Sequence, residues 1–333
     1  MKLVEAIRIE VRRRGRPVIT WFEVEQLVRR LYREREYDNQ RLSIRGSYPS
    51  ARTLSQLKGI LIHASYVHGG KLSQRPGYGD TVPEAAMEEF ASIAQPDLLT
   101  VDSNFPRTVL RVTGIPDAPA DEICCLVDPW CYVSHLSAMQ LWGLSNRNSV
   151  ELQITRPAKN LWNERAKKEL KEELGDDYDN LLLGLISASA RERVTFPKIV
   201  RRRRIHTFEP NYFGRSVETL DSATRVATVG QTFRDMLHEP GLCGGMSHVL
   251  DVWDQHAETH LDEIIETLSD PASKTTKIAL VRAGYILTER LALQDNRIDA
   301  WALAAERGGS RRLDPERPFH PSFSERWMLS LNV

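Results

Sequence analysis

Arg52, Ser55 and Gln56 have the side chains and the spacing needed to contact DNA bases. An arginine can form two hydrogen bonds with guanine, and a glutamine can form two with adenine. Arg52 and Gln56 are four residues apart, which puts them on one face of a helix with Ser55 beside them. Early residues of the second helix of a helix-turn-helix contact base edges in the major groove. These three residues are the candidate base-reading set, and the alternative is an ordinary solvent-exposed helix face.

Basic residues near this set suit contacts to phosphate groups, which position a protein on DNA without specifying the sequence. The candidates are Arg41, Arg45, Lys58 and Lys71.

A second basic strip is possible at Arg201–Arg204. We expect this run to lie on a strand over residues 198–208. Alternate residues of a strand point to opposite faces, so at most two of the four arginines would share a surface. The other two would then pair with acidic residues of the same domain.

Candidate catalytic groups are few. Asp128, Glu151 and Gln153 resemble a nuclease triad, but a glutamine stands where such a site has lysine, so the cation beside the attacking water is missing. The sequence has no phosphate-binding loop, no dinucleotide-binding glycine pattern and no His-Glu-x-x-His pair. His135 follows Ser134 directly, and we expect it to form a structural hydrogen bond at a helix start. The prediction is that the chain is not an enzyme.

The cysteines do not form a recognisable metal motif. Four residues could be considered as zinc ligands, namely Cys124, Cys125, Cys131 and His135. Their spacing does not match a usual structural zinc site. These three and Cys243 are expected to be reduced, mostly buried thiols. We expect neither a metal nor a cofactor.

The elements that would position the base-reading set follow from apolar spacing and capping residues. Thr20 followed by Glu23 is a capping box, which marks a helix start. A β-rich run and a Gly-Gly turn then predict a hairpin. The expected elements are a helix over 2–15, a helix from Thr20, a third helix opening at Pro49-Ser50, a strand over 60–67 and a hairpin turn at His68–Lys71. Helices followed by a basic hairpin are the ground plan of a winged helix.

Charge is distributed unevenly along the 333 residues. Residues 1–75 carry 16 lysines and arginines against seven acidic residues, a net +9, and the rest of the chain balances it at −9. Such asymmetry is expected of a basic nucleic-acid-binding module on an acidic body. No run of apolar residues is long enough to span a membrane, and the start lacks the pattern of a secretory signal. We therefore expect a cytoplasmic protein.

The predicted fold class is α+β, with an N-terminal winged helix-turn-helix and a larger mixed α/β C-terminal domain that ends in helices. The predicted domains are 1–75 for the DNA-binding module, 76–122 for a Pro/Gly-rich linker and domain edge, and 123–333 for the second domain. In the second domain the pattern favours β structure near Cys124, a helix over 134–142, a strand over 150–155 and a charged helix over 159–175. From residue 228 onward it favours helices.

Several segments of the second domain resemble the AbiEi family of antitoxins, over residues 123–331. In this family a strand leads into a Ser-His-x-Ser-Ala helix, and a second helix starts with an Ala-Thr segment. Here Val229-Gly230-Gln231 replaces the usual Pro-Glu-Arg-like run. The matching segments are Tyr132–Leu144, Arg225–Leu237, Pro240–Val249 with its Gly-Gly pair, Arg282–Leu287, and Leu313-Asp314-Pro315 ahead of Arg326-Trp327.

The resemblance implies a winged-helix repressor that regulates its own operon in a type IV toxin–antitoxin, or abortive-infection, system. It also implies a genetically linked nucleotidyltransferase-like toxin that the second domain helps to counteract. The expected partners are double-stranded operator DNA and that toxin. The alternatives are a nuclease component of phage defence, which would need an intact set of metal ligands, and a DNA-binding adaptor. An adaptor that binds only a protein is a third, and it would leave DNA unshifted.

Overall fold

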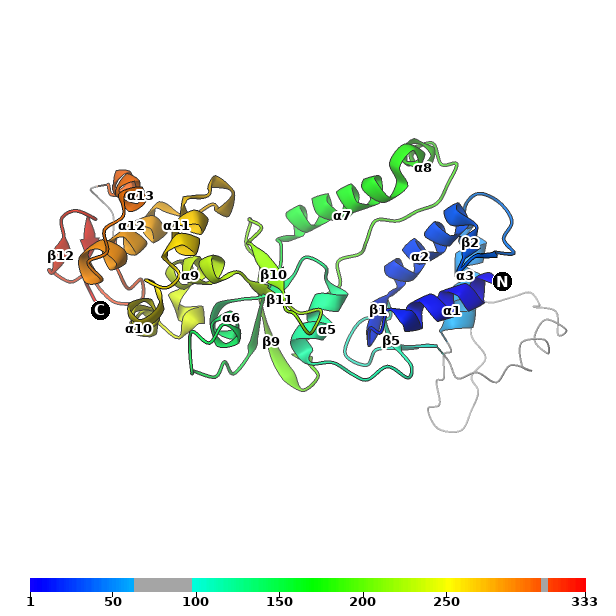
Figure 1. Ribbon diagram of the computed structural model, residues 1–333, viewed down its shortest axis with the longest axis horizontal. Helices are drawn as coiled ribbons and strands as arrows, with labels where there is room; N and C mark the ends of the chain where they lie inside the picture. The colour runs from blue at the N-terminus through cyan, green and yellow to red at the C-terminus, as the bar shows by residue number, and fades with distance from the viewer. Residues whose placement is uncertain (63–97, 307–310) are drawn as a thin grey trace. The chain divides into compact units, whose positions relative to one another are not determined.

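The computed structural model describes residues 1–62, 98–306 and 311–333, which Figure 1 colours from blue to red. The fold is mixed α and β, as the sequence predicts. It divides into two compact units. The first comprises Met1–Ala118 with Glu169–Thr195, and the second comprises Pro119–Lys168 with Phe196–Val333. This division differs from the boundaries expected at residues 75 and 122.

Helices α1, α2 and α3 begin the first unit, and α1 lies beside α2 (Figure 1). Their positions agree with the three helices expected from the sequence. The later segment of this unit adds the end of α7 and two short helical turns. The bounds are α1 (Leu3–Arg13), α2 (Trp21–Glu34), α3 (Ala51–Leu61), α7 (Lys159–Leu174), η1 (Gly175–Asp177) and α8 (Tyr178–Leu182).

Local signals fix the ends of these helices. The Thr20 hydroxyl accepts a hydrogen bond from the Glu23 amide at 3.3 Å, and the Glu23 carboxylate accepts one from the Thr20 amide at 2.8 Å. This confirms the predicted capping box. Gly15, with φ +62°, follows the end of α1 in the left-handed region that glycine tolerates. Ser50 caps α3 by accepting from the Thr53 amide at 3.1 Å.

An antiparallel sheet of order β1-β5-β4 completes the first unit. Its strands are β1 (Val18–Thr20), β4 (Leu99–Val101) and β5 (Val109–Val112), and a hairpin of β2 (Glu36–Tyr37) and β3 (Gln40–Arg41) lies between α2 and α3. Ile19 pairs with Leu110, and Leu110 with Val101. The segment expected to be a linker therefore supplies two strands to this sheet, because β5 pairs with both β1 and β4.

The strand expected over residues 60–67 is corrected at its start. Ile60 and Leu61 form the last turn of α3, where Leu61 is completely buried. Ile62 forms an isolated bridge with Leu99. The expected hairpin turn at 68–71 lies outside the described residues.

The main sheet of the second unit has the order β10-β11-β6-β7-β9-β8. Parallel pairs join β11 to β6 and β7 to β9, whereas β6 and β7 are antiparallel. A small pair, β12 and β13, lies near the end of the chain (Figure 1). The bounds are β6 (Tyr132–Val133), β7 (Leu152–Thr155), β8 (Ile199–Val200), β9 (Arg203–Phe208), β10 (Ser216–Glu218), β11 (Arg225–Ala227), β12 (Phe323–Ser324) and β13 (Leu329–Ser330).

Helices dominate the second unit after residue 228, as expected, and their apolar faces surround Phe233, Trp253 and Trp327. Within the described ranges, none of the helices is long and apolar enough to cross a membrane. The bounds are α5 (Ala120–Val127), α6 (His135–Leu141), α9 (Val229–His238), η2 (Pro240–Cys243), α10 (Met246–His256), α11 (Leu261–Ser269), η3 (Pro271–Ser273), α12 (Lys277–Tyr285), η4 (Ile286–Arg290), α13 (Asn296–Asp299) and η5 (Ala300–Ala304).

The β structure expected near Cys124 is wrong, because this segment forms helix α5. Its residues 123–127 are all buried. An apolar run that is buried on every side has no periodicity that distinguishes a helix from a strand. The helix is favoured by Asp121 and Glu122 in its first turn, where carboxylates interact well with the helix dipole.

Candidate nucleic-acid interface

Helix α3 exposes the predicted base-reading set on one face. Arg52, Ser55 and Gln56 are all exposed, while Leu57 and Leu61 on the opposite side are buried in the core of the first unit. Gly59, also exposed, continues the face one turn further. The three predicted residues are thus brought together in the first half of the helix, which is the part that a recognition helix presents to bases.

Three arginines at the end of α1 and on α2 surround one buried carboxylate within the first unit. The carboxylate of Glu10 lies 2.6 Å from Arg13, 3.5 Å from Arg14 and 3.0 Å from Arg30. Tyr37 donates to the same group at 3.1 Å. Burial opposes ionisation of Glu10, but the hydrogen bonds from Arg30 and Tyr37 and the charge of Arg13 lower its pKa overall. Glu10 offsets one of these three positive charges, and the net charge of +9 for residues 1–75 already counts it.

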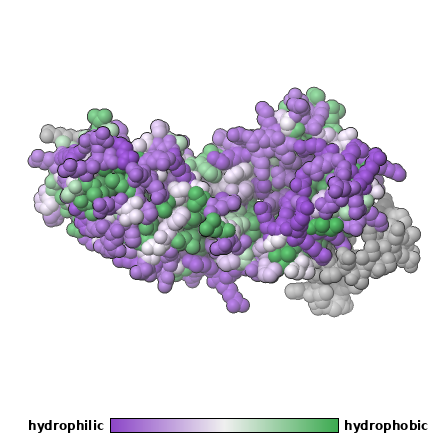
Figure 2. Space-filling view, in the orientation of Figure 1, coloured by the Kyte–Doolittle hydropathy of each residue, from purple (hydrophilic) through white to green (hydrophobic). Residues whose placement is uncertain are grey.

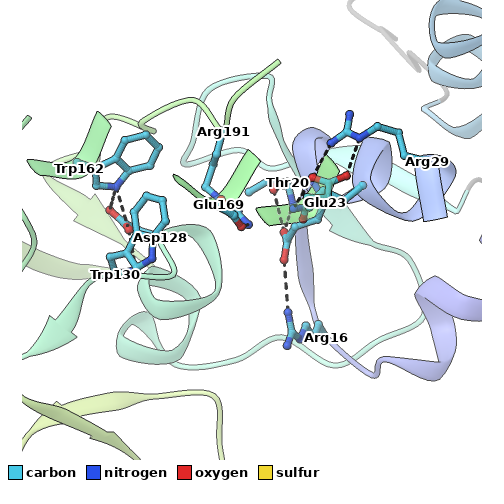
Figure 3. Close-up of polar contacts among 11 residues, drawn as sticks. Arg16, Thr20, Glu23, Arg29, Asp128, Trp130, Trp162, Glu169 and Arg191 are labelled. Atoms are coloured by element: carbon cyan, nitrogen blue, oxygen red, sulfur yellow. Dashed lines mark hydrogen bonds and ion pairs between the residues drawn. The ribbon is translucent and has the colours of Figure 1, made fainter. Parts of the chain in front are cut away.

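Arg29 is also internal, with only 3% of its surface exposed. Its guanidinium forms two hydrogen bonds with Glu173, at 2.7 and 3.1 Å, and lies over the Phe22 ring. Arg191 contacts the other end of this cluster, 4.6 Å from the Phe22 ring centre and bidentate to Glu169 (Figure 3). Glu173 at the end of α7 thus binds α2 through Arg29, and Arg191, after α7, packs on the Phe22 ring of the same helix.

Arg41, Arg45 and Arg52 differ from the arginines above. Each is exposed, and within the described part of the chain none forms an ion pair. Lys58 is exposed too, but its ammonium lies 5.2 Å from the centre of the Trp21 ring. Lys71 lies outside the described residues. Figure 2 shows hydrophilic side chains gathered over α1 and α2, on the face in view.

The β4–β5 hairpin carries a basic residue that the sequence analysis missed. Its connection runs over residues 102–108 and exposes Arg107, which forms no ion pair with any described residue. Asp102 shapes the turn by accepting from the Asn104 amide at 2.9 Å. The signal that could have found it is the apolar run on each side of Ser103-Asn104-Phe105-Pro106, a turn composition between two strands.

The nuclease-like residues of the second unit have structural partners. Asp128 is buried, and its carboxylate contacts the Arg156 guanidinium at 2.6 Å and the Trp162 indole N–H at 3.1 Å (Figure 3). Gln153 donates to the Leu242 carbonyl at 2.7 Å, and Glu151 lies 3.8 Å from His206. Both Asp128 oxygens therefore have partners within the second unit.

The cysteines are buried thiols, as expected. Cys131 donates to the Cys124 carbonyl at 3.3 Å, and burial raises the pKa of both thiols well above the ordinary value. Among the described residues, no three His, Cys, Asp or Glu side chains come together as metal ligands. His135 begins α6 with its Nδ1 at 2.8 Å from the Ser134 hydroxyl, which is the structural hydrogen bond predicted for it.

The arginine run lies on a hairpin and not along one strand, which corrects the prediction. Arg201 and Arg202 form the two-residue connection between β8 and β9, and Arg203 and Arg204 open β9. All four line one open hollow. Strand alternation does not apply to the residues of the turn, so the expected limit of two arginines on one surface is wrong.

Two of the segments that carry the family resemblance meet in the core of the second unit. Strands β6 and β11 are parallel neighbours, with Val133 opposite Val226, and each leads into a helix. Helix α9 contributes a buried cluster in which Gln231 donates to Asp235 at 2.7 Å and Arg234 lies 3.3 Å from the same oxygen. Burial raises the pKa of Asp235 to about 6, against the lowering effect of Arg234.

A comparison of the chain with models of known protein families and with curated proteins found no match.

Proposed function

We propose that this chain is a DNA-binding transcriptional repressor whose first unit is a winged helix. The observation that carries the proposal is the order α1, β1, α2, β2, β3, α3, β4, β5 among the described residues, combined with the sheet order β1-β5-β4. In that plan α2 and α3 are the helix-turn-helix, α3 is the recognition helix, and the β4–β5 hairpin is the wing.

The side chains of α3 support the same assignment. Arg52 and Gln56 would read bases with Ser55 beside them, and Arg41, Arg45 and Lys58 would contact phosphates. Lys71, assigned to phosphate from the sequence, keeps that role in the proposal. Arg107 joins them, because a wing places its tip against the DNA backbone.

For the second unit we propose the antitoxin role of an AbiEi-type protein, without catalytic activity and in the cytoplasm. The proposal rests on the resemblance of its motifs. It gains support from their convergence at β6, β11 and α9, and from the engagement of Asp128 by Arg156 and Trp162. The toxin it would counteract is a nucleotidyltransferase-like enzyme encoded beside it.

The repressor role is tested with a reporter gene placed behind the DNA that lies upstream of the chain's own gene. Repression of this reporter by the chain is measured. Replacing Arg41, Arg45 and Arg52 with alanine in the full-length chain should abolish repression, while Arg12→Ala, which removes an exposed charge from α1, should not. Equal repression by both variants would refute the winged-helix assignment.

Co-expression with the neighbouring toxin gene tests the antitoxin role. The full chain should restore growth, and the triple variant should still do so when it is supplied from a foreign promoter. Absence of protection by the full chain would refute the antitoxin role.

A further inference from the structure

The β8–β9 hairpin gathers arginines around one open hollow of about 550 Å³ in the second unit. The side chains that line it carry either positive charge or neutral groups, and among the described residues of the lining none is acidic. They are Arg201, Arg202, Arg203, Arg204, Gln140, Asn148, Ser149 and Val150. A surface with this composition suits an anion, because arginine donates paired hydrogen bonds to phosphate oxygens.

The turn itself is built from residues that its backbone disfavours. Arg201 and Arg202 have φ of +47° and +66°, the left-handed region that two-residue hairpins require at both central positions. The β2–β3 hairpin has the same two-residue connection, and there Asp38 and Asn39 occupy the left-handed positions. Asn and Asp adopt this backbone more readily than arginine does. Two arginines at such a turn point to a function for their side chains.

Three of the arginines at the hollow have no acidic partner among the described residues. Arg202, Arg203 and Arg204 are exposed, and none forms an ion pair with a described residue. The adjacent strand β7 is preceded by Glu151, but its carboxylate lies toward His206, at 3.8 Å from Nδ1. Several exposed arginines elsewhere in the same unit are ion-paired, such as Arg326 with Asp299 at 2.6 Å.

The neutral wall of the hollow is held in place by side-chain hydrogen bonds. Gln140 of α6 donates to Asn148 at 3.0 Å and accepts from the Ser149 amide at 3.2 Å. This clamp fixes the loop before β7 beside the arginines. The result is a preorganised surface, whose side chains lose less freedom when a ligand binds.

We propose that the β8–β9 hairpin is a second DNA-binding site, which contacts the phosphate backbone of double-stranded DNA. The hollow is open, whereas sites for small ligands enclose most of their ligand. Consecutive arginines at its rim fit successive phosphates of a polymer. Contacts of this kind carry no sequence information, so the site strengthens binding to every sequence alike. The inference rests on the proposed function, in that DNA is the polyanion the chain binds.

Salt-dependent binding of the full-length chain to a random-sequence duplex tests the site. The variant Arg202→Gly, Arg203→Ala, Arg204→Ala removes the charges while glycine suits the turn. Each lost phosphate contact lowers the slope of log affinity against log salt by about 0.9, so we expect a fall of up to about 2.7. The matched control replaces Arg290, Arg297 and Arg326, which are ion-paired in the same unit, and should leave the slope unchanged.

The variant with Arg41, Arg45 and Arg52 replaced separates this inference from the proposed function. If the hairpin variant keeps the slope of log affinity against log salt while the Arg41, Arg45 and Arg52 variant has a smaller slope, the hairpin site is refuted and the winged-helix assignment stands. If only the hairpin variant has a smaller slope, the hairpin site stands and the winged-helix assignment is refuted. An equal loss in the ion-paired control would refute the hairpin site, because net charge alone would then explain the effect. No binding of DNA by the unaltered chain would refute both.

Discussion

The Arg29 guanidinium and the Glu173 carboxylate form a buried pair, with two hydrogen bonds of 2.7 and 3.1 Å across 144 residues of sequence. Removing one partner of such a pair leaves a charge in a poorly solvated place. We therefore expect Glu173→Ala to reduce the free energy of unfolding of the first unit by about 3 kcal/mol. Urea unfolding measures this. Glu164→Ala, at an exposed position of the same helix, is the control and should change stability by less than about 0.5 kcal/mol.

His135 should make the second unit sensitive to acid. Burial, with smaller effects of His206 and Arg234, lowers its pKa to about 3 in the fold, against 6.5 when unfolded. The unfolded state therefore binds the proton first, and stability is lost as pH falls from about 6.5 towards 3. Asp235, whose pKa is raised to about 6, acts in the opposite direction between about pH 4 and 6.

The variant His135→Asn isolates this contribution, because asparagine tolerates the left-handed φ of +51° and does not titrate. Asp235 is common to both proteins and cancels. Between about pH 7.5 and pH 5 the unaltered chain should lose about 2 kcal/mol more than the variant in urea unfolding. If the free energies of unfolding of the two proteins change with pH in parallel, His135 is not held neutral in the fold.

Gly284 permits the close packing of Trp327 against α12. A Cβ at this position would lie 2.1 Å from the indole ring, which is completely buried. Gly284→Ala should therefore destabilise the second unit by about 1–3 kcal/mol through overpacking. Gly59→Ala in α3 is the matched control, since nothing lies within 4 Å of its added Cβ, and it should stabilise by up to about 1 kcal/mol. Thermal unfolding of both variants measures these changes in stability. A Gly284→Ala protein as stable as the unaltered chain would show that the Trp327 ring can shift freely.

The β8–β9 turn predicts a conflict between stability and binding. Arg202→Gly relieves a left-handed arginine and should raise the free energy of unfolding by about 1 kcal/mol. The same change removes a charge from the hollow and should weaken binding to random-sequence DNA. Denaturant unfolding and anisotropy on one protein preparation give both values. A less stable variant would mean that Arg202 makes contacts that outweigh its backbone strain.

Short-range signals in the sequence predicted the helices of the first unit well. The capping box at Thr20 and Glu23 and the cap at Ser50 involve residues three apart, so they can be identified without knowing the fold. The sheet could not be found this way, because Ile19 pairs with Leu110 across 91 residues of chain.

The sequence identifies the candidate charged residues, but it does not show which of them are ion-paired in the fold. The sequence cannot tell that Arg13, Arg14 and Arg30 surround the Glu10 carboxylate whereas Arg52 forms no ion pair with a described residue, because the count of charges is the same in either case. The arginine turn was missed because Arg201 and Arg202 lack the Asn-Gly or Asp-Gly composition by which two-residue turns are identified.

The central claim, that α3 reads DNA bases, is tested most directly by comparing two affinities for each variant. Binding to the DNA upstream of the gene and to a random duplex is measured by fluorescence anisotropy at one salt concentration. Arg52→Ala and Gln56→Ala should each reduce the free-energy difference between the two DNAs by about 1–3 kcal/mol. Arg12→Ala, an exposed arginine of α1, should leave that difference unchanged. An equal loss of affinity for both DNAs in Arg52→Ala and Gln56→Ala would contradict base reading by this helix.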